Sequence, residues 1–430
     1  MNILIIGNGG REHALAWKAA QSPLANKVFV APGNAGTALE TGLENIDIAV
    51  DNIHDLIQFA QNNEVGLTIV GPEMPLVLGI VDRFSEAGLK CFGPSQKASQ
   101  LEGSKAFSKD FLAKHQIPTA AYANFTEITP ALDYLQQCDF PIVIKADGLA
   151  AGKGVIIAED LASAETAVKD MLEGNRFGEA GNRVVIEEFL IGEEASFIVM
   201  ADGQAILPMA SSQDHKAALN GDKGANTGGM GAYSPAPIVT PEMHQHIMQT
   251  VIRPTIEGMA KDGMPYTGFL YAGVMIDQQG IAKVLEFNCR FGDPETQPIM
   301  MRLQSDLVSH CLAAIAKTLA DEQAQWDSRA ALGVVLTAQG YPNQYPSGDE
   351  IKGLTTTENK NQKVFHAGTK LNQDKVVTSG GRVLCATALG ENVTAAQQKA
   401  YELVKQISWQ GMTYRTDIGY RAVAREKNAN

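Results

Sequence analysis

The first hundred residues alternate short apolar runs with amphipathic segments, and this alternation constrains the fold more than any other feature of the chain. The runs NILIIG, KVFVAPG, LTIVGPE and KCFGPS are interspersed with the segments REHALAWKAAQS, HDLIQFAQNNEV and GIVDRFSEAG. Such a pattern is typical of βαβ units around a parallel sheet. Ligands bind outside the carboxyl ends of the strands in these sheets. We therefore expect Gly7 to Gly10, Pro32 to Gly36 and Gly71 to Glu73 to outline one crevice.

Length, charge and cysteine content limit the function classes. With domains of about 150 residues, the 430 residues have room for about three domains. The balance of 35 basic against 48 acidic residues, a net charge of −13, argues against nucleic acid and membrane surfaces as partners. The 5 cysteines include no CxxC pair, which favours reduced thiols. Ile3 to Ile6 is too short for a signal peptide and no apolar stretch reaches membrane-spanning length. We predict a cytoplasmic monomer.

The glycine-rich loop after the first apolar run is a candidate phosphate site. A dinucleotide fingerprint requires G-x-G-x-x-G and an acidic residue at the end of the second strand. Gly7 and Gly9 fit this pattern, but Glu12 occupies the third glycine position and the second strand ends in Ala31 and Pro32. The pattern disfavours an NAD site. It leaves two alternatives, a loop that binds one phosphate on its N–H groups and a plain tight turn.

A second glycine-rich stretch, GLAAGKG at Gly148 to Gly154, resembles a Walker A loop only superficially. It is one residue short, and Gly154 stands where a Walker A loop has its magnesium-binding hydroxyl. The flanking runs PIVIKAD and GVIIAED predict two strands, with Lys145 on the first. A glycine loop between two antiparallel strands is either a lid that folds over a triphosphate or a plain hairpin.

Glu286 and Asn288 in VLEFNCRFGDPE predict a metal site. They are two residues apart on an expected strand, so both side chains point to the same face. A carboxylate and an amide oxygen suit Mg²⁺, which completes its shell with phosphates. The alternative is the solvated face of an edge strand, but Asn is a poor strand residue. Arg290 follows at the same alternation and places a cation beside the expected metal.

The run RVVIEEFLIGEE predicts a strand that ends at Glu187 and Glu188, followed by the apolar residues Phe189 and Leu190. Backbone groups at such a position can read the edge of an adenine while a carboxylate holds the ribose hydroxyls. An ordinary acidic turn is the alternative, and these residues alone do not separate the two.

The chain resembles the phosphoribosylamine–glycine ligase family through a series of motifs in the family's order: GNGGREHALAW, APGNAGT, IVGPE, LEGSK, VIKADGLAAGKGV, EEFLIGEEASF, QDHK, NTGGMGAYSP, EFNCRFGDPETQP and GGRVL. The resemblance spans essentially the whole chain. The family belongs to the ATP-grasp superfamily, in which two α+β lobes clamp ATP. It implies a multidomain α/β and α+β fold: a Rossmann-like parallel-sheet domain at 1–103, an ATP-grasp domain at 104–328 with a mobile lid subdomain at about 121–191, and a small closing α+β domain at 329–430.

The resemblance also implies an activity and its participants. The activity is ATP-dependent ligation of glycine to 5-phosphoribosylamine through glycyl phosphate, giving glycinamide ribonucleotide, ADP and phosphate in de novo purine biosynthesis. The implied cofactors are ATP and Mg²⁺ or Mn²⁺. Such phosphoryl transfer requires charge neutralisation and positioning more than a general base.

The resemblance assigns roles residue by residue. Glu286 and Asn288 are the expected metal ligands, and Arg290, Asp214 and Lys216 the expected catalytic residues. The expected ATP contacts are Lys105, Lys145, Gly152, Lys153, Gly154, Glu187, Glu188, Phe189, Leu190 and Glu193. The expected substrate contacts are Gly9, Gly10, Asn34, Gly36, Thr37, Pro72, Glu73, Asp214, His215, Asn226, Thr227, Gly228, Gly229 and Asp293.

Two positions depart from the family pattern, and two other functions compete with the one it implies. Ala217 stands where an Arg usually follows the Lys, and Ala225 where a Pro usually precedes NTGG. The nearest competing function is that of another ATP-grasp carboxylate–amine ligase, which shares the nucleotide lobe but not the amine acceptor. The other is a nucleotide-sensing protein that has lost the reaction, against which the intact Lys105, Lys145 and Glu286 argue.

Overall fold

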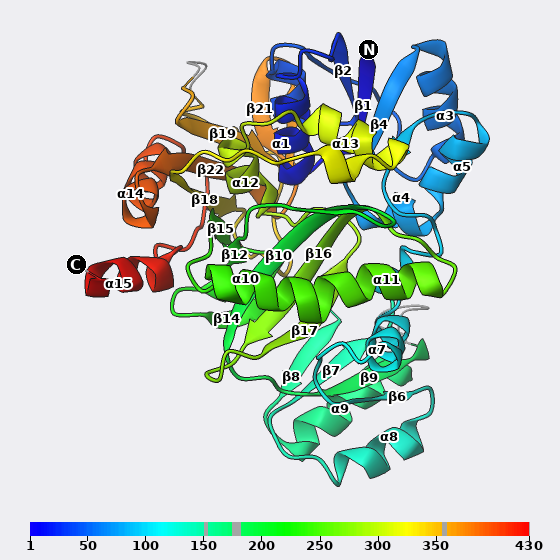
Figure 1. The fold of residues 1–430 in the computed structure, drawn as a ribbon. Coiled ribbons are helices and arrows are strands. Elements are labelled where there is room, and N and C mark those ends of the chain that lie inside the picture. The colour runs from blue at the N-terminus through cyan, green and yellow to red at the C-terminus, as the bar shows by residue number, and fades with distance from the viewer. Residues whose placement is uncertain (150–153, 174–181, 355–358, 430) are drawn as a thin grey trace.

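The computed structural model describes residues 1–149, 154–173, 182–354 and 359–429 (Figure 1). The predicted loop contacts Gly152 and Lys153 lie outside these residues. Among the described residues, no helix has both the length and the apolar character that crossing a membrane requires.

The N-terminal region is a parallel sheet covered by helices, as its alternating pattern predicts. Its strands have the order β3-β2-β1-β4-β5, and every pairing between them is parallel. The strands are β1 (Asn2–Gly7), β2 (Lys27–Pro32), β3 (Leu43–Asn45), β4 (Val65–Val70) and β5 (Cys91–Phe92). The helices of this region are α1 (Gly10–Ala19), α2 (Ala35–Leu39), α3 (Ile53–Asn62), α4 (Glu73–Val77) and α5 (Ile80–Glu86). Helices α6 (Gln100–Gly103) and α7 (Lys105–Lys114) follow, and α7 packs against strands of the two sheets described next.

An antiparallel sheet forms the centre of the molecule and is crossed by the long α10–α11 helical segment in Figure 1. Its strand order is β11-β10-β16-β17. The strands are β10 (Glu193–Asp202), β11 (Ile206–Pro208), β16 (Thr267–Ile276) and β17 (Ala282–Asn288). The helices that follow or cover them are α10 (Pro241–Ile247), the π-helical turn Met248–Ile252, α11 (Arg253–Lys261), α12 (Thr296–Arg302), α13 (Leu307–Ala316) and a 3₁₀ turn at Leu319–Asp321.

A second antiparallel sheet, drawn at the bottom of Figure 1, forms the subdomain predicted as a lid. Its order is β6-β9-β7-β8, and it shares a separate apolar core with its two helices. The elements are β6 (Tyr122–Phe125), α8 (Ile128–Leu135), β7 (Ile142–Ala146), β8 (Val155–Ala158), α9 (Leu161–Leu172) and β9 (Val184–Glu188). Strands β7 and β8 pair antiparallel, as the sequence on either side of the glycine-rich loop predicts.

The C-terminal sheet includes strands from the middle of the chain. Its order is β12-β15-β18-β22-β19, and β15 pairs with β18 across the predicted boundary between residues 328 and 329. The strands are β12 (Gln213–Asp214), β15 (Gly231–Ser234), β18 (Ala330–Thr337), β19 (Gln362–His366) and β22 (Arg382–Gly390). Outside this sheet lie the hairpins β13–β14 (Ala217–Leu219, Lys223–Asn226) and β20–β21 (Thr369–Asn372, Lys375–Thr378), and the helices α14 (Val393–Val404) and α15 (Tyr420–Ala429).

Candidate active site

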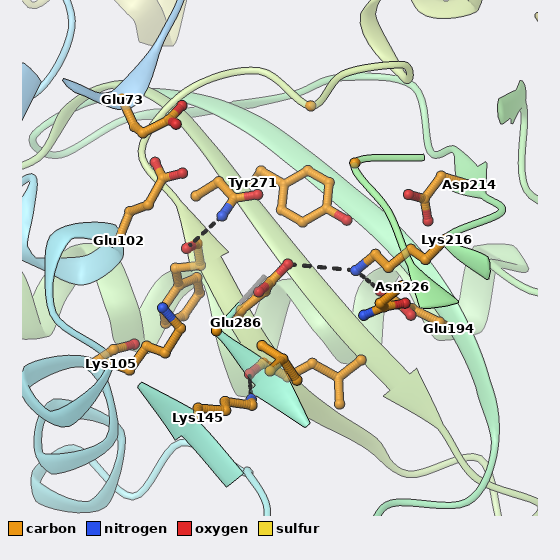
Figure 2. Close-up of a pocket in the computed structure, with 18 of the residues that line it drawn as sticks. Glu73, Glu102, Lys105, Lys145, Glu194, Asp214, Lys216, Asn226, Tyr271 and Glu286 are labelled. Carbon is orange, nitrogen blue, oxygen red and sulfur yellow. Dashed lines mark hydrogen bonds and ion pairs between the residues drawn. The ribbon is translucent and has the colours of Figure 1, made fainter. Parts of the chain in front are cut away.

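A cavity of about 540 Å³ lies where the central sheet meets the lid subdomain, the N-terminal domain and the C-terminal sheet. Charged side chains line it, with Glu286 of β17 near the middle of the view in Figure 2. The residues predicted from sequence that line it are Pro72, Glu73, Lys105, Lys145, Gly154, Glu187, Glu188, Phe189, Leu190, Asp214, Lys216, Asn226, Thr227, Gly228, Glu286, Asn288, Arg290 and Asp293.

Glu286 is an ionised carboxylate surrounded by cations. Its Oε1 lies 3.5 Å from the Lys216 Nζ. Burial by itself would raise the Glu286 pKa, but the charges of Lys216, Lys145 and Lys105 outweigh burial and hold the pKa at about 2. Asn288 lines the same cavity, and its amide nitrogen donates to the Phe287 carbonyl at 3.0 Å, so the amide oxygen is the atom left for a ligand.

The donor set at Glu286 and Asn288 fits a cation that brings most of its own ligands. Within the described ranges, no cluster of three or more His, Cys, Asp and Glu side chains could hold a metal by itself. Mg²⁺ is commonly held by one or two protein oxygens together with substrate phosphates and waters. The two side chains therefore suit a metal that enters with a nucleotide.

Glu187 lines the cavity and binds two lysines. Its carboxylate lies 3.0 Å from the Lys145 Nζ and 2.9 Å from the Lys109 Nζ, and its side chain is 3% exposed. Lys145 also donates to the Leu285 carbonyl at 3.2 Å. Burial lowers the pKa of Lys109 to about 8. Because the Glu187 carboxylate is occupied by these lysines, it is not free to hold a ribose, and a contact from Glu187 to a nucleotide is restricted to its backbone.

Glu193, a predicted nucleotide contact, is paired with residues outside the cavity. Its carboxylate forms an ion pair with Arg425 of α15 and accepts a hydrogen bond from Gln213 at 2.9 Å. Side chains alternate along β10, so Glu193 and its neighbour Glu194 point to opposite faces. Glu194 is the one that lines the cavity, where it pairs with Lys216.

Arg290 lines the cavity, as predicted, but is already paired. Its Nη2 lies 2.8 Å from Glu102 and its Nε lies 3.3 Å from Glu73. Burial opposes its charge, but these two carboxylates raise the Arg290 pKa above its usual value. Burial also raises the pKa of Glu102 to about 7. These two ion pairs therefore fix the orientation of the Arg290 guanidinium. One of the two partners, Glu73, is a predicted substrate contact.

Asp214 and Glu295 form a buried acidic pair beside Lys216. Burial raises the Asp214 pKa well above its usual value, and the Glu295 charge adds to this effect. Glu295 accepts a hydrogen bond from the Ser196 hydroxyl at 2.8 Å, and burial raises its pKa too. Among these groups the Lys216 ammonium stays charged: burial lowers its pKa, but Glu194 and the other acidic groups around it together outweigh burial and raise the pKa. The cluster is therefore able to hold a proton or a cationic ligand.

Among the residues that the structure describes, seven of the predicted substrate contacts do not line the cavity. These are Gly9, Gly10, Asn34, Gly36, Thr37, His215 and Gly229.

The first of these, Gly9, belongs to a loop that Glu12 already caps. The Gly9 N–H donates to Glu12 Oε2 at 2.6 Å. A Cβ atom on Gly7, whose φ is +131°, would lie 2.3 Å from the Glu12 Cγ, so glycine is required there. Glu12 thus occupies the helix terminus where a phosphate was expected. Gly9 does not line the cavity itself but lies next to Asp293, which does: a Cβ on Gly9 would lie 3.2 Å from Asp293 Oδ2.

Asn34 and His215 serve local structure instead of the cavity. Asn34 Oδ1 caps α2 by accepting the N–H groups of Gly36 and Thr37 at 2.8 and 3.1 Å. His215 Nε2 accepts the Gly419 N–H at 3.1 Å. Burial lowers the His215 pKa to about 4, so the ring is neutral at pH 7. The Asn34 side chain and the His215 Nε2 atom are therefore engaged in local structure, and the two substrate assignments stay predictions.

The cavity also contains charged residues and a tyrosine that sequence reasoning missed. Lys109 had a signal, since it lies four residues after Lys105 and therefore on the same face of α7. The others come from separate elements and share no local pattern. The missed residues are Arg11, Glu102, Lys109, Glu194, Tyr271, Glu295 and Arg382.

The fold and the site define an ATP-grasp protein. Residues 103–296 match the family model described as the phosphoribosylglycinamide synthetase ATP-grasp (A) domain. The fold is also similar to that of biotin carboxylase from Campylobacter jejuni in a complex with β,γ-ATP, with a TM-score of 0.76 at 16% identity over 99% of this chain and 98% of that one. That likeness supports the fold class alone.

The chain belongs to the phosphoribosylamine–glycine ligase family. Residues 1–102 and 331–421 match the N and C domains of phosphoribosylglycinamide synthetase. The chain is 67% identical to the phosphoribosylamine–glycine ligase of Vibrio vulnificus (strain CMCP6) over 99% of its length and 100% of the relative's. It is 67% identical to that of Haemophilus influenzae over 99% of both. The crystal structure of the Thermotoga maritima ligase superposes with a TM-score of 0.84 at 32% identity, covering 97% of this chain and 100% of that one.

Proposed function

We propose that this chain joins glycine to 5-phosphoribosylamine at the expense of ATP, giving glycinamide ribonucleotide, ADP and phosphate in purine biosynthesis. Its family membership supports this reaction. The observation that carries it is the position of Glu286 and Asn288 opposite the lysines of one charged cavity. That arrangement suits transfer of a phosphoryl group from a metal-bound nucleotide to a carboxylate.

ATP is assigned to the half of the cavity next to the lid. Lys105 and Lys145 face the phosphates, and Lys105 is held by a hydrogen bond to the Gly148 carbonyl at 2.8 Å. The backbone of Glu188 to Leu190 faces the adenine, with Glu194 replacing Glu193 as the ribose carboxylate. Glu286 and Asn288 would hold Mg²⁺ or Mn²⁺. The metal, when bound, neutralises phosphate charge and favours departure of ADP.

Glycine and the ribosylamine are assigned to the half of the cavity away from the lid. In the first step a glycine carboxylate oxygen attacks the γ-phosphorus of ATP, and ADP leaves. In the second, the amine nitrogen attacks the carbonyl carbon of glycyl phosphate, and phosphate leaves. The amine loses one proton, which we assign to Asp214, because this carboxyl lines the half of the cavity assigned to the substrates. Lys216 and Arg290 balance the developing negative charge.

The residues that contact the two substrates are assigned by their positions around this second half. Asp293 is assigned to the glycine ammonium group, beside the loop residues Asn226 to Gly228. Pro72 and Glu73 are assigned to the ribosylamine. The glycine-rich loop at Gly9 is assigned a position next to Asp293 and no direct contact with the substrate, because the Gly9 N–H already donates to Glu12.

An assay of ADP formation with omission of single substrates tests this function. Purified protein is mixed with ATP, Mg²⁺, glycine and freshly made 5-phosphoribosylamine, and the product mass is determined. We expect one ADP for each glycinamide ribonucleotide and no ADP release above background when either substrate is omitted. ADP release that follows formate or bicarbonate in place of glycine would instead indicate another ATP-grasp ligase. ATP binding without turnover under every condition would indicate a nucleotide-sensing protein.

A further inference from the structure

Hairpin β13–β14 projects from the edge of the cavity, and both of its ends carry cavity residues. Lys216 lies immediately before β13, and Asn226 is the last residue of β14. The hairpin is closed at this root by Thr227, whose N–H and hydroxyl both donate to the Lys216 carbonyl, at 2.8 and 2.7 Å. Residues 220–226 are all exposed. With so little buried surface, the hairpin has no apolar core to fix its direction.

The C-terminal segment holds this hairpin by its tip. Asp222, at the turn, accepts hydrogen bonds from the Tyr420 hydroxyl and from Arg421 Nη2, both at 2.8 Å. Its other oxygen lies 2.9 Å from Arg415 Nη1. The neighbouring turn residues add further bonds: Asn220 to Thr416 at 2.6 and 3.0 Å, and Gly221 N–H to Asp417 at 2.8 Å.

The segment that makes these contacts is itself firmly placed. Arg415 is 1% exposed, pairs with Asp417 at 2.8 Å and donates to the Ala217 carbonyl of β13 at 3.1 Å. Ile418 is fully buried against the C-terminal sheet. Further along, Arg425 pairs with Glu193, directly beside the cavity residue Glu194. Residues 415–425 thus contact both the hairpin and the start of β10.

We propose that residues 415–421 are a positioning element of the active site, and that Asp222 is the positioning residue through which they fix Lys216 and Asn226. The kinetic part of this proposal rests on the proposed function. A hairpin released at its tip tilts about its root, so the root residue Lys216 moves relative to Glu286. Most residues assigned to ATP lie on elements that do not contact the hairpin, and Glu194 is the one that pairs with Lys216. The effect therefore falls more on the two substrates than on the nucleotide.

The test compares three variants with the wild-type chain. Asp222→Asn removes the charge that binds Arg415 and Arg421. Because Asp222 has a φ of +55°, Asn is chosen as a residue that tolerates this conformation. Tyr420→Phe removes one hydrogen bond at the same carboxylate. Asp374→Asn is the matched control, an exposed aspartate between β20 and β21, at the tip of another hairpin.

The first measurement is limited trypsin digestion, in which mass spectrometry quantifies cleavage after the exposed Lys223. The second is a comparison of the KM values for glycine and phosphoribosylamine with the Kd for ATP. We expect Asp222→Asn to increase Lys223 cleavage and to raise at least one substrate KM by about ten- to a hundredfold, with a smaller change in the Kd for ATP. Tyr420→Phe should give the same changes to a smaller extent, and Asp374→Asn none.

Two results would overturn the proposal. One is a cleavage rate in Asp222→Asn equal to that of wild type, which would show that the carboxylate does not hold the tip. The other is faster cleavage with both substrate KM values unchanged, which would show anchoring without positioning. A failure of the proposed function looks different, since the wild-type chain would then lack turnover while Lys223 cleavage still depends on Asp222.

Discussion

The Arg382 guanidinium lies 3.4 Å from the Asp293 carboxylate, and the same guanidinium donates to the backbone carbonyls of Asp293 and Gly228. Arg382 begins β22 of the C-terminal sheet, whereas Asp293 follows β17 of the central sheet. One side chain therefore connects the acidic turn after β17 to the loop before β15. Both segments line the cavity in the half that we assign to the substrates.

Arg382→Lys should weaken the use of glycine while leaving ATP binding unchanged. A lysine keeps the charge but lacks the planar fork that reaches a carboxylate and several carbonyls together. We expect kcat/KM for glycine to fall by about ten- to a hundredfold, measured beside the Kd for ATP. Arg329→Lys is the control, because Arg329 pairs with Asp327 in a similar manner away from the cavity. An equal fall of kcat/KM for glycine in both variants would show that Arg382 has no specific role in binding glycine.

Glu286→Gln should abolish most of the turnover. The substitution keeps the size of the side chain and removes the charge that Lys216, Lys145 and Lys105 hold ionised. Because a metal at the transferring phosphate contributes several kcal/mol, we expect kcat to fall at least about a hundredfold. Excess Mn²⁺ should restore part of the loss. The exposed Glu402→Gln serves as the control. Near-normal turnover in Glu286→Gln would exclude Glu286 as a metal ligand.

Gly9→Ala should raise the KM for phosphoribosylamine more than the KM for ATP. Gly9 has a φ of −85°, so alanine is compatible with the backbone and the effect is steric. The new Cβ would lie 2.7 Å from Glu12 Oε2 and 3.2 Å from Asp293 Oδ2, and both carboxylates would have to shift. The KM for ATP is the internal reference. A defect confined to ATP would contradict the placement of this loop on the substrate side.

Local patterns were sufficient for the features that depend on neighbouring residues. The alternation of apolar and amphipathic runs predicts the parallel sheet, and the two-residue spacing of Glu286 and Asn288 predicts their common face. Each of these inferences needs only the periodicity of one element. The family could be predicted only from the motifs, because a hydrophobic periodicity predicts secondary structure and not family membership.

Features that depend on the pairing of distant segments could not be predicted. Whether Glu193 or Glu194 faces the cavity depends on which face of β10 packs inward, and both are followed by the same apolar run. Glu12 appeared as a missing glycine, whereas its side chain fills the space over the loop. Arg382 reaches Asp293 across 89 residues, through a contact between two sheets. Such contacts follow from tertiary packing, which a single sequence does not display.

The link between Glu40 and Lys363 should make stability depend on acid pH. Glu40, just after α2, lies 2.8 Å from Lys363 and 3.1 Å from the buried His13, joining the N-terminal domain to β19. Burial opposes the ionised form, but hydrogen bonds from His13 and Lys363 prevail and lower the Glu40 pKa from 4.5 to about 2. A carboxyl whose pKa is lower in the folded state stabilises fully above the unfolded pKa, and this contribution is lost as pH falls through the folded pKa.

Glu40→Gln should therefore lower the Tm at pH 6, and the difference from wild type should shrink as the pH falls from 4.5 towards 2. The variant resembles the protonated residue, so the two proteins converge where Glu40 itself takes up a proton. Burial lowers the pKa of both neighbouring histidines, His13 and His366, and Glu40 opposes that lowering, so both ring pKa values are lower in Glu40→Gln than in wild type at pH 6. Glu44→Gln removes an exposed pair with Lys27 and should have little effect at any pH. A Tm difference that stays constant from pH 6 to pH 3 would show that Glu40 is not the titrating group, because its loss would then act through packing alone.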